Sequence, residues 1–298
     1  MAQPTTVPSF AARRAALRAR VNQRQFVSAP GVYDLISARI ADEMGFSALY
    51  MTGYGTVASH LGLPDAGLAT YSDMVGRVAQ ISKMTRTPLI ADADTGYGGL
   101  RNVQHTVRGY EEAGAAAIQI EDQEFPKKCG HTPGKRVIPT ADMVRKVKVA
   151  VEARQDPNFL IIARTDARTM HGLDDALARA RAYAEAGADV LFVEAPESED
   201  EMARIGKSLT TPLLANMADG GKTPVLSRAR QEALGYAIAI FPGASFLAAG
   251  AVLRTVYTTI RDTGSSAGLT VPLHDFAAFN KLMGFEAVWD FDKAHADD

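Results

Sequence analysis

The sequence has little of what marks secreted, membrane-spanning or nucleic-acid-binding proteins. Its 298 residues contain one cysteine, Cys129, so no internal disulfide can form, which is typical of a reducing compartment. No apolar run approaches the roughly 18 residues that a membrane-spanning helix requires. Residues 1–20 hold several arginines but no continuous apolar segment of a signal peptide. The formal net charge is only −2, which favours neither nucleic acid nor a membrane surface as a partner. We therefore expect a cytoplasmic protein without such partners.

The length and composition indicate one α/β domain. Hydrophobic residues make up 47% of the chain and charged residues 22%, as in ordinary globular proteins. A chain of this length is long for an average domain but usual for an α/β barrel. The chain has no linker or low-complexity tract, so we expect residues 1–298 to form a single barrel domain.

A repeated pattern predicts the architecture. Four times a helical stretch ends in a glycine that precedes a short apolar run: Gly45 before 48–51, Gly114 before 117–120, Gly187 before 190–193 and Gly235 before 237–240. Glycine ends helices because it adopts a left-handed conformation at little cost, and continuous apolar runs are typical of buried parallel strands. Four more runs lie at 26–29, 88–91, 159–163 and 212–215, and helical spacing is clear over 140–154 and 173–186. Eight strands alternating with helices predict a (β/α)8 TIM barrel.

The last segment, 271–298, lies outside this pattern. It contains a group of large apolar side chains: Phe276, Phe279, Leu282, Met283, Phe285 and Trp289. We expect a C-terminal helical extension. Its apolar surface is consistent with packing on a neighbouring subunit and equally with packing on its own barrel.

The active site of such a barrel lies at the carboxyl ends of the strands. The residues at these ends are mostly polar: Thr52, Gly53, Tyr54, Asp92, Asp94, Glu121, Arg164, Glu194 and Asn216, with Pro242 after the eighth strand. Polar groups that converge from many strands indicate a site more strongly than any one motif does.

Three of these acids, Asp92, Asp94 and Glu121, are predicted to surround one metal ion. Asp92 and Asp94 stand two residues apart, so in a regular strand both side chains point to the same face. Donors that are all oxygen favour Mg²⁺ or Mn²⁺ over Zn²⁺. The alternative is that these acids cap helices or form ion pairs with Arg101 and Lys127.

The loop after the fourth strand carries the only cysteine. Two lysines and His131 flank Cys129, and neighbouring cations lower the pKa of a thiol. We therefore predict a catalytic Cys129 that transfers a proton, with His131 in the same site; the alternative is a small buried residue. Gly130 and Gly134 would let this loop open and close over a substrate, excluding water.

Arg164 directly follows five apolar residues, so its charge is expected to lie in buried surroundings and to need an anionic partner. The guanidinium fork matches a carboxylate. That partner is either Glu194 or a carboxylate of the substrate, and we favour the substrate.

These motifs resemble the isocitrate lyase/phosphoenolpyruvate mutase superfamily over about residues 26–257. The run 127–131 (KKCGH) is similar to the hallmark of its carbon–carbon bond lyase branch, and 91–96 (ADADTG) is similar to its metal motif. The segments 61–65, 163–167 and 192–195 match as well. The resemblance implies a (β/α)8 barrel, Mg²⁺ and a 2-hydroxy or 2-oxo carboxylic acid as substrate. It also implies a homotetramer, a dimer of dimers, in which a C-terminal helix is swapped between subunits.

The resemblance also implies a role for each site residue. Asp92 would bind the metal directly, and three other acids would act mainly through metal-bound water: Asp65, Asp94 and Glu121. One set would hold the 2-oxygen and carboxylate of the substrate: Thr52, Gly53 and Tyr54. Another set would bind or orient carboxylates: Gly130, His131, Arg164, Glu194 and Asn216. Cys129 would be the general acid, and the base would be either Tyr54 or a metal-bound hydroxide.

Within the superfamily, Cys129 argues against the phosphonate enzymes, which lack it. Methylisocitrate lyases carry an arginine for the third carboxylate where this chain has Leu247, which favours a dicarboxylate over a tricarboxylate. Oxaloacetate acetylhydrolases carry a serine where this chain has Pro242, an apolar residue suited to an alkyl group. We therefore expect a lyase that cleaves a 2-alkylmalate, best 2,3-dimethylmalate to pyruvate and propionate. The alternatives are a 2-methylisocitrate lyase, which yields pyruvate and succinate, an oxaloacetate acetylhydrolase, and a barrel that binds metabolites without catalysis.

Overall fold

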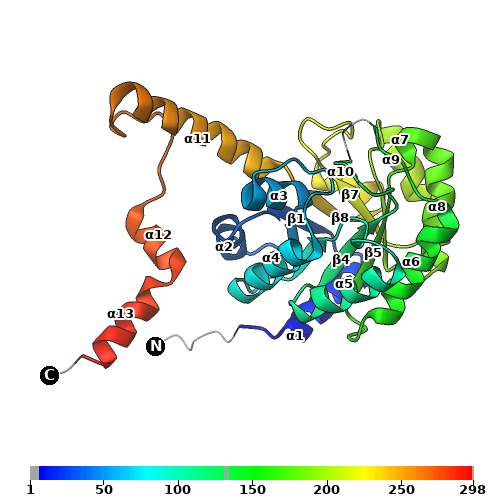
Figure 1. The fold of residues 1–298 in the computed structure, drawn as a ribbon, viewed down its shortest axis with the longest axis horizontal. Helices are drawn as coiled ribbons and strands as arrows, with labels where there is room; N and C mark the ends of the chain where they lie inside the picture. Colours follow the sequence, from blue (N-terminus) through cyan, green and yellow to red (C-terminus); the bar gives the residue numbers. More distant parts are fainter. Residues whose placement is uncertain (1–6, 131, 133, 297–298) are drawn as a thin grey trace. The chain divides into compact units, whose positions relative to one another are not determined.

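The computed structural model describes residues 7–130, 132 and 134–296, and its larger unit is a closed barrel of eight parallel strands (Figure 1). The strands pair in chain order, and β1 also pairs with β8. Their bounds are β1 (Val27–Val32), β2 (Leu49–Met51), β3 (Leu89–Asp92), β4 (Ala117–Glu121), β5 (Leu160–Thr165), β6 (Val190–Val193), β7 (Leu213–Asn216) and β8 (Tyr236–Phe241). Each strand overlaps one of the eight predicted apolar runs, so the predicted (β/α)8 barrel is confirmed.

The helices of this unit alternate with the strands and cover the outside of the barrel (Figure 1). They are α1 (Phe10–Asn22), α2 (Leu35–Glu43), α3 (Gly53–Leu61), α4 (Tyr71–Met84), α5 (Leu100–Glu112), α6 (Thr140–Ala153), α7 (Arg168–His171), α8 (Leu173–Glu185), α9 (Glu199–Ser208) and α10 (Arg228–Ala233). The helices predicted at 140–154 and 173–186 correspond to α6 and α8.

The four glycines of the repeated pattern all have positive φ angles, from 75° at Gly45 to 102° at Gly187. The amide of each donates to the carbonyl oxygen three residues earlier, for example Gly187 to Ala184 at 2.9 Å. Since an L side chain is strained at such φ angles, glycine can end each helix and turn the chain into the next strand.

Two apolar clusters hold the barrel together. One fills the space between the sheet and the surrounding helices, and the other fills the barrel interior. Leu17 and Val21 of α1 belong to the interior cluster together with Val27 at the start of β1, so α1 covers the amino-terminal end of the barrel. The opposite end remains for chemistry, as in other barrels of this kind.

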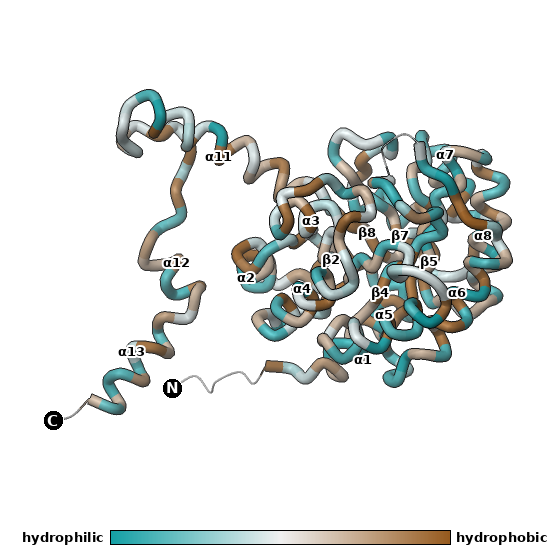
Figure 2. The backbone as a smooth tube through the Cα atoms, in the orientation of Figure 1, coloured by the Kyte–Doolittle hydropathy of each residue, from teal (hydrophilic) through white to brown (hydrophobic). Residues whose placement is uncertain are grey.

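The second compact unit, Ser245–Asp298, contains α11 (Ala244–Thr263), α12 (Phe276–Met283) and α13 (Phe285–Ala294). Between residues 271 and 296, α12 and α13 supply helices of the expected C-terminal extension, and the compact unit also includes most of α11. None of the residues in these three helices is buried, and apolar residues recur along them (Figure 2). Among the described residues, no helix is both long and apolar enough to cross a membrane.

Candidate active site

The carboxyl ends of five neighbouring strands bring buried polar side chains together. Asp92 ends β3, Glu121 ends β4, Arg164 lies near the end of β5, Glu194 follows β6 and Asn216 ends β7. The register pairs Glu121 directly with Arg164. These five predicted site residues are each at most 8% exposed, and they form one polar cluster at the end of an apolar barrel.

Arg164 forms ion pairs with three carboxylates at this end of the barrel. Its guanidinium forms a fork with Asp166, through Nε to Oδ2 at 2.8 Å and Nη2 to Oδ1 at 3.0 Å. It also lies 3.2 Å from Glu194 and 3.4 Å from Glu121. Burial opposes the charge of Arg164, but these three carboxylates outweigh it and raise its pKa well above the ordinary value. Of the two predicted anionic partners, Glu194 is therefore in contact with Arg164, together with Asp166 and Glu121. The favoured partner, a carboxylate of the substrate, stays a prediction.

The segment between β4 and α6 carries Cys129 and is called the cysteine loop. Its Gly130 lies directly against Arg164 and Glu194. A Cβ atom at this position would overlap Nη2 of Arg164 and lie 2.9 Å from Oε2 of Glu194. Only glycine therefore fits without movement of the charged cluster. Asn216 completes this side, because its Nδ2 donates to Glu194 Oε2 at 3.1 Å.

A second group of acids surrounds the end of β3. Oδ1 of Asp92 accepts from the amide of Asp94 at 3.0 Å. The strand ends at Asp92 and Asp94 has a φ of 49°, so the two acids are not successive same-face residues of a regular strand, as predicted, but are joined by a turn. A Cβ atom on Gly53 would lie 2.6 Å from Asp92 Oδ2, so glycine at this position allows the carboxylate to lie close to the start of α3.

The ammonium of Lys127 links this group to the cysteine loop. It forms ion pairs with Asp65 and, at 2.6 Å, with Asp94. Burial alone would lower the pKa of Lys127, but Asp94, Asp65 and Glu121 outweigh it and raise that pKa well above its usual value. Burial raises the pKa of Asp94 to about 7, against the effect of Lys127. The alternative pairing of the acids with Lys127 is therefore present, whereas the side chain of Arg101 contacts Gln104.

The residues at this end of the barrel fit an oxygen-liganded cation, although no three Asp, Glu, His or Cys side chains among the described residues are already arranged around one point. Oε1 of Glu121 is buried and has no hydrogen-bond partner within the described part of the chain. Lys127 shows that Asp65 and Asp94 attract a positive charge. Buried carboxylate oxygens of this kind are the donors that Mg²⁺ and Mn²⁺ take.

Hydrogen bonds hold the backbone of the cysteine loop at Lys128 and Cys129. The amide of Cys129 donates to the carbonyl oxygen of Asp65 at 3.2 Å, and its own carbonyl accepts from Thr132. The side chain of Gln123 forms two hydrogen bonds with the backbone of Lys128. Its Nε2 donates to the carbonyl oxygen at 2.8 Å, and its Oε1 accepts from the amide at 3.0 Å. Cys129 is partly exposed, so the alternative of a fully buried thiol does not hold. His131 lies outside the described residues.

Comparison with known proteins decides the family. The protein-family model described as phosphoenolpyruvate phosphomutase matches residues 17–261, most of the chain. The chain belongs to this family. The predicted membership of the isocitrate lyase/phosphoenolpyruvate mutase superfamily is thereby confirmed.

Two curated relatives cover nearly the whole chain. The 2,3-dimethylmalate lyase of Eubacterium barkeri is 47% identical over 95% of this chain and 98% of its own. A 2-methylisocitrate lyase of Aeropyrum pernix is 43% identical over 94% and 89%, respectively. Both relatives are named lyases.

Two solved structures are similar to the chain throughout. Oxaloacetate acetylhydrolase in complex with the inhibitor 3,3-difluorooxalacetate has a TM-score of 0.90 at 35% identity, covering 96% of this chain and 97% of the other. A phosphonopyruvate hydrolase in complex with oxalate and Mg²⁺ has a TM-score of 0.86 at 28% identity, covering 95% and 99%. One of these similar structures was thus solved with Mg²⁺ and oxalate, a small dicarboxylate.

The remaining predicted site residues lie in different surroundings. Thr52 is buried and caps α3, and Tyr54 in the first turn of that helix is 44% exposed. Pro242 directly follows β8, and its carbonyl oxygen would lie 2.6 Å from a Cβ on Gly31. Leu247 lies on α11 in the second unit, so its role in substrate choice stays a prediction.

Sequence reasoning missed Lys135 and the importance of Asp166. The ammonium of Lys135 lies 2.8 Å from Asp166 Oδ1 and also donates to the carbonyl oxygen of Gly130. Burial opposes ionisation of Asp166, but Arg164 and Lys135 outweigh it and lower its pKa to about 2. The position of Asp166, two residues after a buried arginine, was a usable signal; the sequence around Lys135 carries none.

Asp122 is buried directly after β4 and stabilises the cluster through hydrogen bonds. Its carboxylate accepts from the hydroxyl of Thr165 at 2.7 Å, the amide of Asp166 at 2.9 Å and the hydroxyl of Tyr183 at 2.7 Å. The bonds from Thr165 and Asp166 join the end of β4 to the end of β5, and the bond from Tyr183 joins it to α8. Asp122 therefore fixes the backbone from which Arg164 and Asp166 project.

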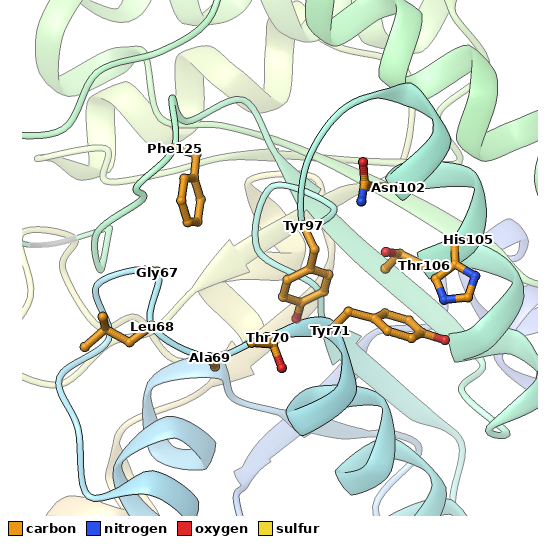
Figure 3. A pocket seen from close by; sticks show the side chains of 10 residues that line it. All are labelled: Gly67, Leu68, Ala69, Thr70, Tyr71, Tyr97, Asn102, His105, Thr106 and Phe125. Carbon is orange, nitrogen blue, oxygen red and sulfur yellow. The ribbon is translucent and has the colours of Figure 1, made fainter.

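A cavity of about 310 Å³ lies beside the start of the cysteine loop (Figure 3). Its wall is formed by Gly67, Leu68, Ala69, Thr70, Tyr71, Tyr97, Asn102, His105, Thr106 and Phe125. None of these is a predicted site residue. A Cβ on Gly67 would lie 3.3 Å from the backbone nitrogen of Lys127, so the cavity is adjacent to the loop but separate from the polar cluster.

Proposed function

We propose that this chain is a Mg²⁺-dependent carbon–carbon lyase that cleaves a 2-alkylmalate, with 2,3-dimethylmalate as the preferred substrate. One observation carries the proposal: the cysteine loop contacts both halves of the site. Gly130 lies on Arg164 and Glu194, and Lys127 pairs with Asp65 and Asp94. Cys129, which carries the only thiol of the chain, lies in the sequence between these two contacting residues.

Asp92 would hold the metal directly, and Asp65, Asp94 and Glu121 would hold it through water. When bound, Mg²⁺ or Mn²⁺ supplies a Lewis acid that lowers the pKa of the 2-hydroxyl group of the substrate. Mn²⁺ binding, followed by its electron paramagnetic resonance signal, tests this set. Asp92→Asn should weaken Mn²⁺ binding by about tenfold or more, because it removes a charged ligand, and unchanged affinity would contradict the assignment.

The residues of the chain would perform the remaining steps. Arg164 would bind the carboxylate of the departing fragment and stabilise the charge that develops on it. Cys129 would donate a proton to its carbon as general acid. Tyr54, exposed at the start of α3, is the candidate that accepts the hydroxyl proton. Cleavage of the C2–C3 bond of 2,3-dimethylmalate then yields pyruvate and propionate.

The choice of a 2-alkylmalate rests on Leu247, which favours a dicarboxylate, on Pro242, which suits an alkyl group, and on the 47% identity to 2,3-dimethylmalate lyase. A third carboxylate without a cationic partner would be costly in a closed site. The identity to a 2-methylisocitrate lyase, at 43%, and the fold of oxaloacetate acetylhydrolase keep those two activities as the second candidates.

The test is pyruvate release with Mg²⁺, coupled to lactate dehydrogenase, on a panel of acids. The panel contains 2,3-dimethylmalate, other 2-alkylmalates, 2-methylisocitrate and oxaloacetate, and oxalate is also measured for the last. A higher kcat/KM for an alkylmalate supports the proposal. A preference for 2-methylisocitrate or for oxalate release selects one of the second candidates, and no turnover with any acid leaves a metabolite-binding barrel.

The proposal includes a homotetramer with swapped C-terminal helices and a location in the cytoplasm. What supports the tetramer is the exposed apolar surface of α12 and α13, where Phe276 is 79% and Trp289 is 54% exposed. What supports the location is the single cysteine of the chain.

A further inference from the structure

Lys135 is buried in the site although no sequence pattern marks it. Its side chain is 1% exposed, its ammonium lies 2.8 Å from Asp166 Oδ1, and it donates to the carbonyl oxygen of Gly130. A buried ammonium requires a charged partner and further hydrogen bonds to offset its desolvation. Lys135 has both, and the two contacts join the cysteine loop to the end of β5.

The contact with Gly130 matters because Gly130 lies on Arg164 and Glu194. The hydrogen bond from Lys135 holds the Gly130 carbonyl, and therefore the backbone, in this close approach. Cys129 is the preceding residue, so the place of Gly130 fixes the backbone that carries the thiol. Without Lys135, the amide of Cys129 would keep its bond to Asp65, but the other end of the segment would lose this anchor.

The ion pair of Lys135 with Asp166 changes the net charge around Arg164. Three carboxylates, those of Asp166, Glu121 and Glu194, lie within 3.4 Å of the single guanidinium of Arg164. Their formal sum with Arg164 is −2, and the ammonium of Lys135 reduces it to −1. Lys135 therefore reduces the repulsion of an anionic substrate. Because it also offsets the charge of Asp166, Arg164 can interact more strongly with a carboxylate of the substrate.

We propose that Lys135 is a positioning residue of this lyase, which holds Cys129 in place through Gly130 and leaves Arg164 available to a substrate carboxylate through Asp166. The kinetic part of this inference rests on the proposed function. The part about the loop does not, because the reactivity of the only cysteine reports the position of the loop without any substrate.

The test uses Lys135→Met in the full chain. We expect kcat for pyruvate release to fall about ten- to a hundredfold and KM to rise, as for loss of hydrogen bonds from a charged group. We also expect alkylation of Cys129 by iodoacetamide, without substrate, to become at least about threefold faster because the loop opens more often. Lys135→Arg keeps the charge beside Asp166 and should recover KM more than kcat.

Arg136 provides the matched control. It is the next residue, it is exposed, and its side chain pairs with the exposed Glu124. Arg136→Met removes one positive charge from the same loop and should leave kcat, KM and the alkylation rate within about twofold, as expected for a surface ion pair.

Circular dichroism and thermal unfolding establish that each variant is folded. If Lys135→Met does not fold, the double variant Lys135→Met/Asp166→Asn removes both buried charges, and faster alkylation of Cys129 is again expected. A folded Lys135 variant with wild-type alkylation and kcat would overturn the inference. If the wild type releases no pyruvate from any acid, the proposed function fails, and the alkylation rates alone still decide the role of Lys135 in holding the loop.

Discussion

At the scale of single residues, Gly130 shows how a missing side chain shapes the site. Any Cβ there would overlap Arg164 and lie 2.9 Å from Glu194 Oε2. We expect Gly130→Ala to lower kcat/KM about a hundredfold, because small displacements of catalytic groups cost this much. The pyruvate assay measures it. Gly76→Ala on α4, where a Cβ meets nothing within 4 Å, is the control and should leave activity unchanged.

A substitution of Cys129 can distinguish an effect on ligand binding from an effect on turnover. Cys129→Ser should still bind Mg²⁺ and pyruvate but lose turnover by about a hundredfold to ten-thousandfold, which is the range for loss of a general acid. Titration calorimetry with pyruvate measures the binding and the coupled assay measures the turnover. Activity like that of the wild type in this variant would rule out the proton-donor role.

At the scale of elements, the strands were predictable because each is buried on both faces and is therefore a continuous apolar run. The helix α1 was not predicted, because its role depends on distant partners. Its Arg13 and Arg14 are buried and donate to the carbonyl oxygens of Ser82 and Ala115, 69 and 101 residues away. Such contacts exist only after the barrel has closed.

The helix ends give a prediction at the same scale. Gly187 follows α8 at a φ of 102°, and a Cβ there would lie 3.3 Å from Val151. We expect Gly187→Ala to lower the free energy of unfolding by about 1–3 kcal/mol, the cost of a strained backbone conformation. Urea unfolding measures this. Gly76→Ala, inside a helix with open space around it, should instead be neutral or stabilising by up to about 1 kcal/mol.

At the scale of the whole molecule, the barrel topology brings together site residues that lie far apart in the sequence. The strand ends were predictable, because parallel strands end at one rim. Pairing of Lys127 with the acids is an alternative that the sequence offers, but its partner Asp65, 62 residues away, was not predictable. Lys135 was not predictable at all, because it meets Asp166 over 31 residues. Lysine is almost never fully buried unless paired, so no local pattern favours these positions.

Assembly is the last property of the whole molecule that can be tested. Monomers rarely expose large contiguous apolar patches, and the exposed apolar residues of α12 and α13 support the proposed interface. We expect light scattering to give four times the chain mass for the wild type. Phe276→Asp/Trp289→Asp places charges on this surface and should shift the mass to dimers or monomers, because an unpaired charge buried in an interface is costly. Lys293→Gln on α13 changes charge without removing apolar surface and should remain tetrameric. A wild-type monomer would refute the swapped tetramer, whereas a tetramer that survives both aspartates would place the interface elsewhere.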